Sequence, residues 1–399
     1  MLIKNCRLVL EDNSEVIRDI LIKDEKIVEI GENLQEIGEE IIDAEKNYVI
    51  PGVVDVHTHM RDPGLSHKED FTSGSMACAK GGVTTFIDMP NTIPNTISEE
   101  VLEEKRKHSL SMSYVDYGFH FGGSRNDNSK EIEKVKNGVA STKIFLNMST
   151  GDMLVEEEKT LENLFKSSKI ISVHSEGEMV KRAIDLSRKY KKPLYLCHLS
   201  LGSEVELLKN AKEEGLEVYG EVAPHHLFFS EKDRNELLRM KPELKSEMDN
   251  SELWKGLNEG VIDTVGTDHA PHRLREKMEK VTFGIPGVEN SLEMMLRGVA
   301  EKKITMRRLI EVMCINPSKI FKIKNKGDIK IGNDGDLVII DIGKKRIIER
   351  DQVISKCGWS PYEGKETGGT VLRTILRGRT VYNQEEFFKK TGREVEYNG

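Results

Sequence analysis

The sequence predicts an α/β protein, a (β/α)8 TIM-like barrel with a small flanking β-sandwich built from both chain ends. Three observations predict this fold. Alternating apolar residues near the amino terminus indicate strands, short apolar runs from residue 53 onward alternate with helical patterns, and the carboxyl-terminal part returns to strands. We therefore expect a β-sandwich of residues 1–50 and 331–399, and a barrel of residues 51–330.

The strands of the flanking domain come from both chain ends. Half-buried strands alternate apolar and polar side chains, because successive residues face opposite sides of a sheet. Near the amino terminus this pattern predicts short antiparallel strands in Leu2–Leu10, Asp19–Ile30 and Glu40–Ile50. Near the carboxyl terminus, after a helical pattern at Met306–Phe321, it predicts strands in Asp336–Ile342 and Thr370–Val381.

The barrel is predicted from apolar runs that follow one another at the spacing of βα units. There are eight such runs: Val53–His59, Val83–Met89, Tyr114–Phe121, Thr142–Leu146, Ile170–His174, Leu194–His198, Leu216–Val222 and Ile262–Asp268. Helical patterns such as Glu178–Lys191 and Ser203–Glu214 lie between several of them. Eight strands with intervening helices are typical of a closed barrel.

The composition is that of a globular chain, with 399 residues, 37% hydrophobic residues and a formal net charge of −8. No apolar run approaches the roughly 20 residues of a membrane span, and MLIKNCRLVL lacks the apolar core of a signal peptide. Without a basic stripe, nucleic acid and anionic membranes are poor candidate partners. We expect a cytoplasmic protein without disulfides, because the five cysteines are scattered and form no CxxC pair: Cys6, Cys78, Cys197, Cys314 and Cys357.

Potential metal ligands stand at the carboxyl ends of the expected barrel strands, which converge on the mouth of such a barrel. An HxH ends the first strand, where alternate side chains point the same way. Two histidines and an aspartate end the fifth, sixth and eighth strands, and a lysine lies in the fourth. The set is His57, His59, Lys143, His174, His198 and Asp268. Together these residues predict a metal site.

The residue types indicate catalysis. Histidine and carboxylate suit a zinc-like divalent ion, and the absence of a cysteine cluster favours a catalytic over a structural site. Two ions roughly 3.5–4 Å apart could share a hydroxide and polarise a carbonyl. Asp268 could accept the proton of that hydroxide and return it to a leaving amide nitrogen. Burial near cations favours the neutral amine of Lys143, which could add carbon dioxide to form a bridging carbamate; the alternative is a purely structural strand lysine.

A series of motifs spans nearly the whole chain. The stretch HTHMRDPGLSHKEDFTSGSMACAKGGVTTFIDMPNTIPNT is followed by VHSE, LCHLS, EVAPHH, TDHAPH and FGIPGVE. In content and order these motifs resemble those of the dihydroorotases, a cyclic amidohydrolase family, and PGVVDVHTH and GDLVIID are similar to the wider amidohydrolase superfamily. The resemblance implies the reversible cyclisation of N-carbamoyl-L-aspartate to L-dihydroorotate plus water, a step of de novo pyrimidine (UMP) biosynthesis.

The resemblance also implies roles for matching residues. His57, His59 and Asp268 would hold one divalent ion, and His174 and His198 a second. Both ions would be zinc, and a carbamate on Lys143 would bridge them. Asp268 would be the catalytic acid and base. Substrate would be bound by His59, Arg61, Asn91, His272, Phe283 and Gly284, with Arg61 gripping a carboxylate through two parallel hydrogen bonds.

The chain departs from the family pattern in three places. TKIFLN supplies Lys143 where the common bacterial form has an aspartate nearby, and Asp152, nine residues further on, is the competing bridge. KPELK replaces the family's NPPLR, so Lys241 stands where a substrate-contacting asparagine is expected. The segment between His174 and His198 is shorter than usual, which would alter the mouth or an oligomer contact.

Five of the remaining histidines have structural interpretations. We expect His225 and His226, after the seventh strand, to support the site or the fold. We expect His67, His108 and His120 to be surface or packing residues.

Two alternative functions remain. A hydantoinase, dihydropyrimidinase or allantoinase would use the same metals on another cyclic amide, but an uncharged ring leaves Arg61 and His272 unused. A metal-free homologue could instead act as a scaffold for a partner such as aspartate transcarbamoylase, but such proteins usually lose ligands and none is missing here. A homodimer and an association with aspartate transcarbamoylase both stay open.

Overall fold

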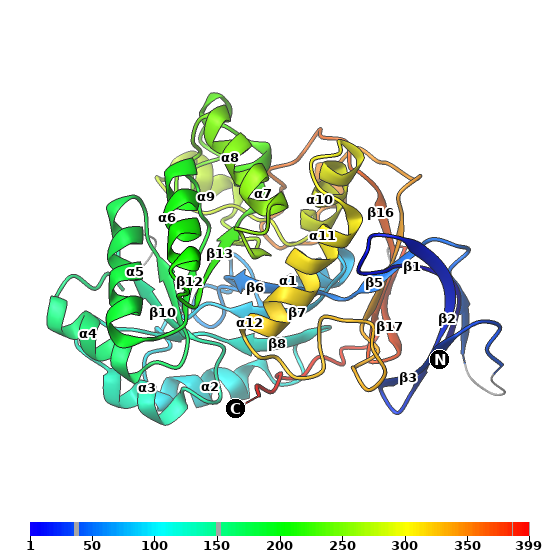
Figure 1. Ribbon diagram of the computed structural model, residues 1–399, viewed down its shortest axis with the longest axis horizontal. Coiled ribbons are helices and arrows are strands. Elements are labelled where there is room, and N and C mark those ends of the chain that lie inside the picture. Colours follow the sequence, from blue (N-terminus) through cyan, green and yellow to red (C-terminus); the bar gives the residue numbers. More distant parts are fainter. Residues whose placement is uncertain (36–39, 149–152, 385, 399) are drawn as a thin grey trace.

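The computed structural model describes residues 1–35, 40–148, 153–384 and 386–398. A barrel surrounded by helices and a curved sheet lie side by side (Figure 1). None of the helices in these ranges combines the length and apolar character that crossing a bilayer requires.

The barrel is built from parallel strands, as predicted. They are β6 (Val53–Thr58), β7 (Val83–Asp88), β8 (Asp116–Phe119), β9 (Phe121–Gly122), β10 (Thr142–Phe145), β11 (Ile171–His174), β12 (Leu194–Leu196), β13 (Val218–Val222) and β14 (Thr264–Val265). Pairing runs β6-β7-β8 on one side and β9-β10-β11-β12-β13-β14 on the other. The expected strand Tyr114–Phe121 is divided at His120 into β8 and β9, and a bridge between Thr58 and His269 joins the other ends. The chain thus closes an eight-membered barrel.

The side chain of His120 connects the point where the strand divides to neighbouring parts of the barrel. Its ring is buried, with Nδ1 2.8 Å from the Ser141 hydroxyl and Nε2 2.8 Å from the Val56 carbonyl. The side chain therefore links neighbouring parts of the barrel, which agrees with the predicted packing role.

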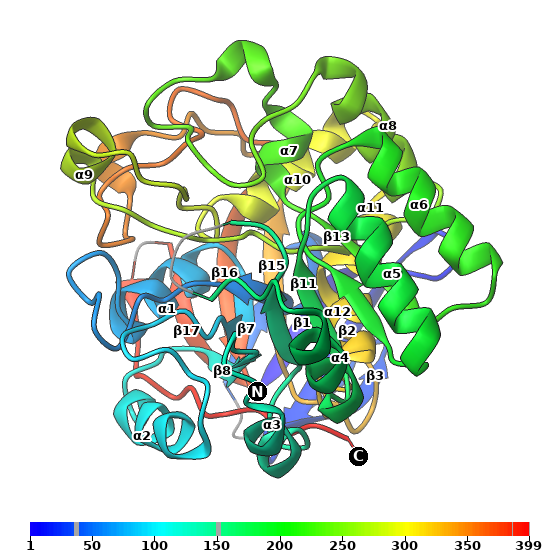
Figure 2. The ribbon, with the colours of Figure 1, turned by 90° about the vertical axis from the view of Figure 1, so that its left-hand side faces the viewer.

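Helices cover the outside of the barrel (Figure 2). The helices of the described residues are α1 (Phe71–Lys80), α2 (Glu99–Ser109), α3 (Ser129–Val135), α4 (Glu158–Ser167), α5 (Glu178–Tyr190), α6 (Gly202–Glu213), α7 (Pro224–Phe228), α8 (Glu247–Asn258), α9 (Leu274–Glu279), α10 (Ser291–Ala300), α11 (Met306–Ile310) and α12 (Asn316–Ile320). A π-helical turn joins α11 to α12, so the helix predicted at Met306–Phe321 is nearly continuous. In α5, Val180, Ala183 and Ile184 recur at helical spacing and are buried, which fixes the face turned to the barrel.

The flanking domain is a single sheet made from both chain ends. Its strands are β1 (Leu2–Val9), β2 (Glu15–Lys23), β3 (Lys26–Gly31), β4 (Ile41–Asp43), β5 (Tyr48–Pro51), β15 (Leu337–Asp341), β16 (Thr370–Leu376), β17 (Arg379–Asn383) and β18 (Glu386–Phe387). Their order is β18-β17-β16-β15-β5-β1-β2-β3, with β4 paired to β1. Ile3, Ile20, Leu337 and Ile375 belong to one buried apolar cluster, so both chain ends share one core.

Two details of this sheet differ from the prediction. The single strand expected at Asp19–Ile30 is a hairpin of β2 and β3, which turns at Asp24 and Glu25, both with positive φ. The expected antiparallel arrangement is wrong for β4 and β5, which pair with β1 in parallel. β4 and β5 lie on the side of β1 opposite to β2 and run in the same direction as β1.

The carboxyl-terminal region also contacts the barrel. The Trp359 indole nitrogen donates to the His272 carbonyl (2.8 Å), and the Ser355 amide donates to Glu289 (3.1 Å). Tyr117 of β8 forms a bridge with Glu394. The domain division at residue 331 stays a prediction, and parts of the chain beyond it lie against the barrel.

A buried lysine joins the two parts. Lys326 Nζ lies 2.6 Å from Asp116 of β8, 2.8 Å from Asp334 and 2.6 Å from Asp336. Burial opposes the charged form, but the surrounding carboxylates outweigh it and raise the pKa of Lys326 above its ordinary value. The three aspartates converge as metal ligands would, but Lys326 already supplies the positive charge between them.

Lys326→Met should therefore destabilise the fold by about 3–5 kcal/mol, because buried Asp336 loses its ion-pair partner, while Asp116 and Asp334 keep Arg377 and Lys26. Urea denaturation would measure the difference. Lys330→Met is the control, since Lys330 is exposed and its one ion pair in the described part of the chain is with Asp328, and it should cost less than about 1 kcal/mol. Equal effects of the two substitutions would show that the network does not stabilise the junction.

Candidate metal and substrate site

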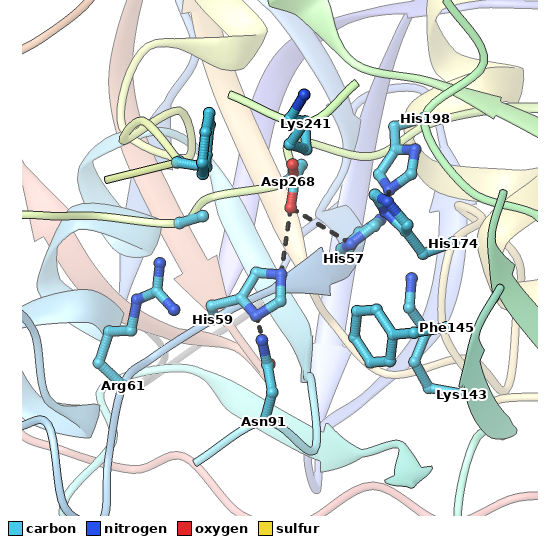
Figure 3. A pocket seen from close by; sticks show the side chains of 13 residues that line it. His57, His59, Arg61, Asn91, Lys143, Phe145, His174, His198, Lys241 and Asp268 are labelled. Atoms are coloured by element: carbon cyan, nitrogen blue, oxygen red, sulfur yellow. Dashed lines mark hydrogen bonds and ion pairs between the residues drawn. The ribbon is translucent and has the colours of Figure 1, made fainter. Parts of the chain in front are cut away.

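A cavity lies at the carboxyl ends of the barrel strands (Figure 3). Its polar lining residues come from several separate strands or the loops that follow them. The lining comprises His57, His59, Arg61, Asn91, Lys143, Phe145, His174, His198, Lys241, Asp268, Ala270, Phe283 and Gly284. The structure thus brings together most of the residues that the sequence indicated.

The first group of metal donors is centred on Asp268. Its Oδ1 lies 3.1 Å from His59 Nε2 and 3.3 Å from His57 Nε2. Both histidines extend from the end of β6, two positions apart, and reach the same carboxylate (Figure 3). One ligand atom from each of the three lies within 4.8 Å of the others, which is close enough to hold one ion.

The second group consists of His174, His198 and Lys143. His174 Nδ1 is 2.9 Å from His198 Nε2, while His174 Nε2 and His198 Nδ1 are buried without a hydrogen-bond partner among the described residues. Lys143 is 1% exposed, and its Nζ lies 3.0 Å from the Cys197 sulfur. The nitrogens that converge, His174 Nδ1 and His198 Nε2, are the pair that could share a second divalent ion.

Glu221 supports both groups and was missed from the sequence. Its Oε1 is 2.6 Å from His57 Nδ1 and accepts the His198 amide (2.9 Å), while its Oε2 accepts the Tyr195 hydroxyl (2.8 Å). A carboxylate on the far nitrogen of a metal-binding histidine orients the ring and leaves the other nitrogen for the metal. The available signal was a glutamate inside the apolar strand at Leu216–Val222.

The position of Cys197 beside these groups was also not predicted from the sequence. Its sulfur lies with ligand atoms of His57 and Glu221 inside one group that spans at most 4.8 Å. All five cysteines are free and buried.

The electrostatics of the site depend on burial and on two carboxylates. Burial lowers the pKa of His59 to about 4 and that of His174 to about 3, so both rings are neutral, as metal ligands must be. Burial acts in the same direction on His57, but Glu221 and Asp268 outweigh it and raise its pKa to about 10. Burial opposes ionisation of Asp268, yet the His57 charge and the His59 hydrogen bond hold its pKa well below the ordinary range.

Arg61 is the buried cation of the cavity. It is 2% exposed, its Nε donates to the Pro271 carbonyl (3.2 Å), and one terminal nitrogen lies 3.3 Å from His272 Nε2. No ion pair joins it to a carboxylate of the described chain. Burial lowers its pKa to about 10, which still leaves it charged at neutral pH.

Of the other predicted substrate contacts, three line the cavity and one, His272, lies outside its lining. Asn91 lines the cavity with its Oδ1 2.7 Å from His59 Nδ1, and Phe283 and Gly284 form part of the wall. Gly284 has a φ of 128°, and a Cβ there would lie 2.5 Å from the Ala270 carbonyl, so only glycine fits. His272 lies behind Arg61 instead, with Nε2 3.0 Å from the Phe283 carbonyl. Burial and the Arg61 charge lower its pKa to about 2, so it contributes no charge.

Three lining residues other than glycine have a left-handed backbone: Arg61, His198 and Asp268, with φ of 61°, 37° and 45°. Such conformations are uncommon outside glycine and are concentrated at functional sites. For Asp268 the conformation also corrects the prediction, because β14 ends at Val265 and not at residue 268. The turn after the strand brings the carboxylate to the histidines.

Lys241 lines the cavity, although the sequence left its role open. Its Nζ lies 2.9 Å from Glu243 and 5.2 Å from the centre of the Phe283 ring. Asp152 lies outside the described residues, so its part as a competing bridge stays a prediction. His225 and His226 are buried, and His67 and His108 are partly exposed, in agreement with their predicted structural or surface roles.

Comparisons with known proteins agree with this geometry. The model of the family described as Amidohydrolase family matches residues 48–381. A dihydroorotase of Methanosphaera stadtmanae is 34% identical over 98% of both chains, and one of Pyrococcus furiosus is 36% identical over 92% of this chain and 90% of that protein. The solved L-hydantoinase (dihydropyrimidinase) from Arthrobacter aurescens superposes with a TM-score of 0.94 and 30% identity over 99% of both chains.

Proposed function

The chain belongs to the amidohydrolase family and, within it, to the dihydroorotases, and from this premise we propose that it catalyses the reversible cyclisation of N-carbamoyl-L-aspartate to L-dihydroorotate and water. The observation that carries the proposal is Arg61. A buried guanidinium that faces a cavity and has no carboxylate partner among the described residues favours an anionic ligand. L-Dihydroorotate offers a ring carboxylate, and the reaction would serve pyrimidine biosynthesis.

A hydantoinase is the second candidate, favoured by the close superposition on an L-hydantoinase. Both activities open a cyclic amide and would use the same histidines and Asp268. The rings differ, however, because hydantoin and dihydrouracil themselves carry no carboxylate. The desolvated charge of Arg61 would then stay uncompensated, so this candidate fits the cavity less well.

We further propose two zinc ions, one held by His57, His59 and Asp268 and the other by His174 and His198. When bound, such ions polarise the amide carbonyl and make an ionised water available at neutral pH. Arg61 would hold the ring carboxylate, with Asn91 and the Gly284 backbone beside it. Asp268 would accept the proton of the attacking water. As the ring carbon–nitrogen bond breaks, Asp268 would deliver that proton to the leaving nitrogen.

A carbamate on Lys143 would complete the donor set. Three features support it: the side chain is 1% exposed, it has no ion pair with a carboxylate among the described residues, and it extends toward the histidine cluster (Figure 3). A carbamate would convert this buried amine into a two-oxygen anion. It would also balance part of the charge of two divalent ions.

Lys143→Ala should lose both bound metal and activity, because the bridging anion is removed. Short carboxylic acids added to the buffer should partly restore both by filling the vacated position. The matched variant Asp152→Ala should keep its metal content, measured by atomic emission. If Lys143→Ala kept its full metal content and Asp152→Ala lost its metal, the bridge would be assigned to Asp152.

The activity itself can be tested in both directions. Ring closure converts a dianion into a monoanion and consumes a proton, so lower pH should favour L-dihydroorotate and higher pH N-carbamoyl-L-aspartate. Zinc-loaded protein should convert either starting compound to the same equilibrium mixture of the two. Chromatography would measure the two compounds over time. Inactivity toward both compounds, with opening of hydantoin or dihydrouracil, would support the second candidate instead.

A further inference from the structure

Lys277 is a buried lysine outside the site described so far. It lies in α9, and its Nζ donates to three backbone carbonyls: Arg239 (2.7 Å), Thr282 (3.1 Å) and Gly284 (3.0 Å). An ammonium group has three N–H donors, so all of its donors are used. A surface lysine would gain little from such bonds, but a buried one depends on them.

The three carbonyls belong to two segments that form the cavity wall. One segment, Arg239–Lys241, carries Lys241, and the other, Thr282–Gly284, carries Phe283 and Gly284. The segments also contact each other directly, because the Gly284 amide donates to the Arg239 carbonyl (3.0 Å). Neither segment is part of a helix or strand, so few other backbone bonds fix their separation.

We propose that Lys277 is a positioning residue for substrate binding: its side chain holds the Arg239–Lys241 and Thr282–Gly284 segments together and so sets the wall that the substrate contacts. The identity of the substrate rests on the proposed function, but the positioning does not. The consequence is that binding should depend on a side chain that does not line the cavity.

The surroundings of Lys277 give the proposal a pH dependence. Burial, with the Arg239 and Arg61 cations nearby, lowers the pKa of Lys277 to about 7. The Thr282–Gly284 segment carries no ionisable side chain, and Glu276 of α9 faces His67 and Lys68. Above pH 7 the neutral amine has two N–H groups for three carbonyls. Substrate affinity should therefore fall as pH rises through about 7.

The test compares Lys277→Met, Lys277→Arg and the control Lys280→Met, which alters an exposed lysine at the end of the same helix. Removing a charged donor from three carbonyls should raise KM for L-dihydroorotate by at least about tenfold in Lys277→Met, with kcat changed by less than about threefold. Lys277→Arg should recover part of the affinity and show a flatter pH profile of KM, because its guanidinium stays charged. Metal content should be equal in all variants.

Hydrogen exchange gives a second measurement that needs no substrate. Peptides covering residues 236–245 and 281–286 should exchange faster in Lys277→Met than in the wild type, and Lys277→Arg should restore protection. Unchanged KM and exchange in Lys277→Met would overturn the proposal, as would a Lys277→Arg variant no better than Lys277→Met. If the wild type does not act on L-dihydroorotate, the proposed function fails, while exchange still decides the role of Lys277.

Discussion

Asp268→Asn should reduce kcat for L-dihydroorotate by about 10²–10⁴-fold, the loss expected when a general base is removed. Asn keeps an oxygen at the position where Asp268 meets His57 and His59, but an amide cannot accept the proton. Steady-state kinetics, with metal content measured on the same sample, would quantify the effect. Asp268→Ala should be at least as severe, because it also removes the metal donor.

Metal content separates the two roles of Asp268. A variant that keeps its metal and loses activity identifies proton transfer as the missing function. Asp351→Asn, on an exposed turn, is the control and should behave as wild type. Near-normal turnover in metal-loaded Asp268→Asn would show that another group moves the proton.

Arg61→Met should change substrate preference. Truncating one member of a buried charge pair costs about 2–5 kcal/mol, or roughly 30- to 5,000-fold in kcat/KM for L-dihydroorotate. Dihydrouracil has no carboxylate for Arg61 to bind, so its much lower kcat/KM should change little or even rise. Measuring kcat/KM on both rings gives the selectivity directly.

Two controls address the buried position of Arg61. Arg61→Lys retains the charge without the two-pronged geometry and should fall between wild type and Arg61→Met. Thermal unfolding and metal content show whether the site remains intact. An equal loss on both rings would mean that Arg61 maintains the cavity and does not choose the substrate.

Much of the fold follows from local pattern. The periods of the apolar residues predicted α5 and α6 to within one residue at each end, because one buried stripe determines a helix. Strand direction was harder to predict from the sequence. The parallel pairing of β4 and β5 with β1 is a tertiary contact, and the alternation of apolar and polar residues is the same in either strand direction.

In the site, too, some features could be predicted from local sequence and others depend on contacts between distant residues. HxH and the strand-end residues could be found because ligand chemistry and strand ends are both visible in a sequence. Glu221 and Lys277 act through partners far along the chain, the imidazole of His57 and the carbonyls of two loops. Neither partner can be identified from spacing. The position of His272 behind Arg61 likewise depends on packing, here against the carbonyl of Phe283.

The central claim is that this cavity selects a cyclic amide bearing a carboxylate. The most direct test is the ratio of kcat/KM for L-dihydroorotate to that for dihydrouracil, measured on the zinc-loaded wild-type protein. With Arg61 paired to the ring carboxylate, the ratio should exceed about 30, the lower end of the effect of a buried charge pair. A ratio near or below one would contradict the account and would assign the protein to the cyclic amidohydrolases of uncharged rings.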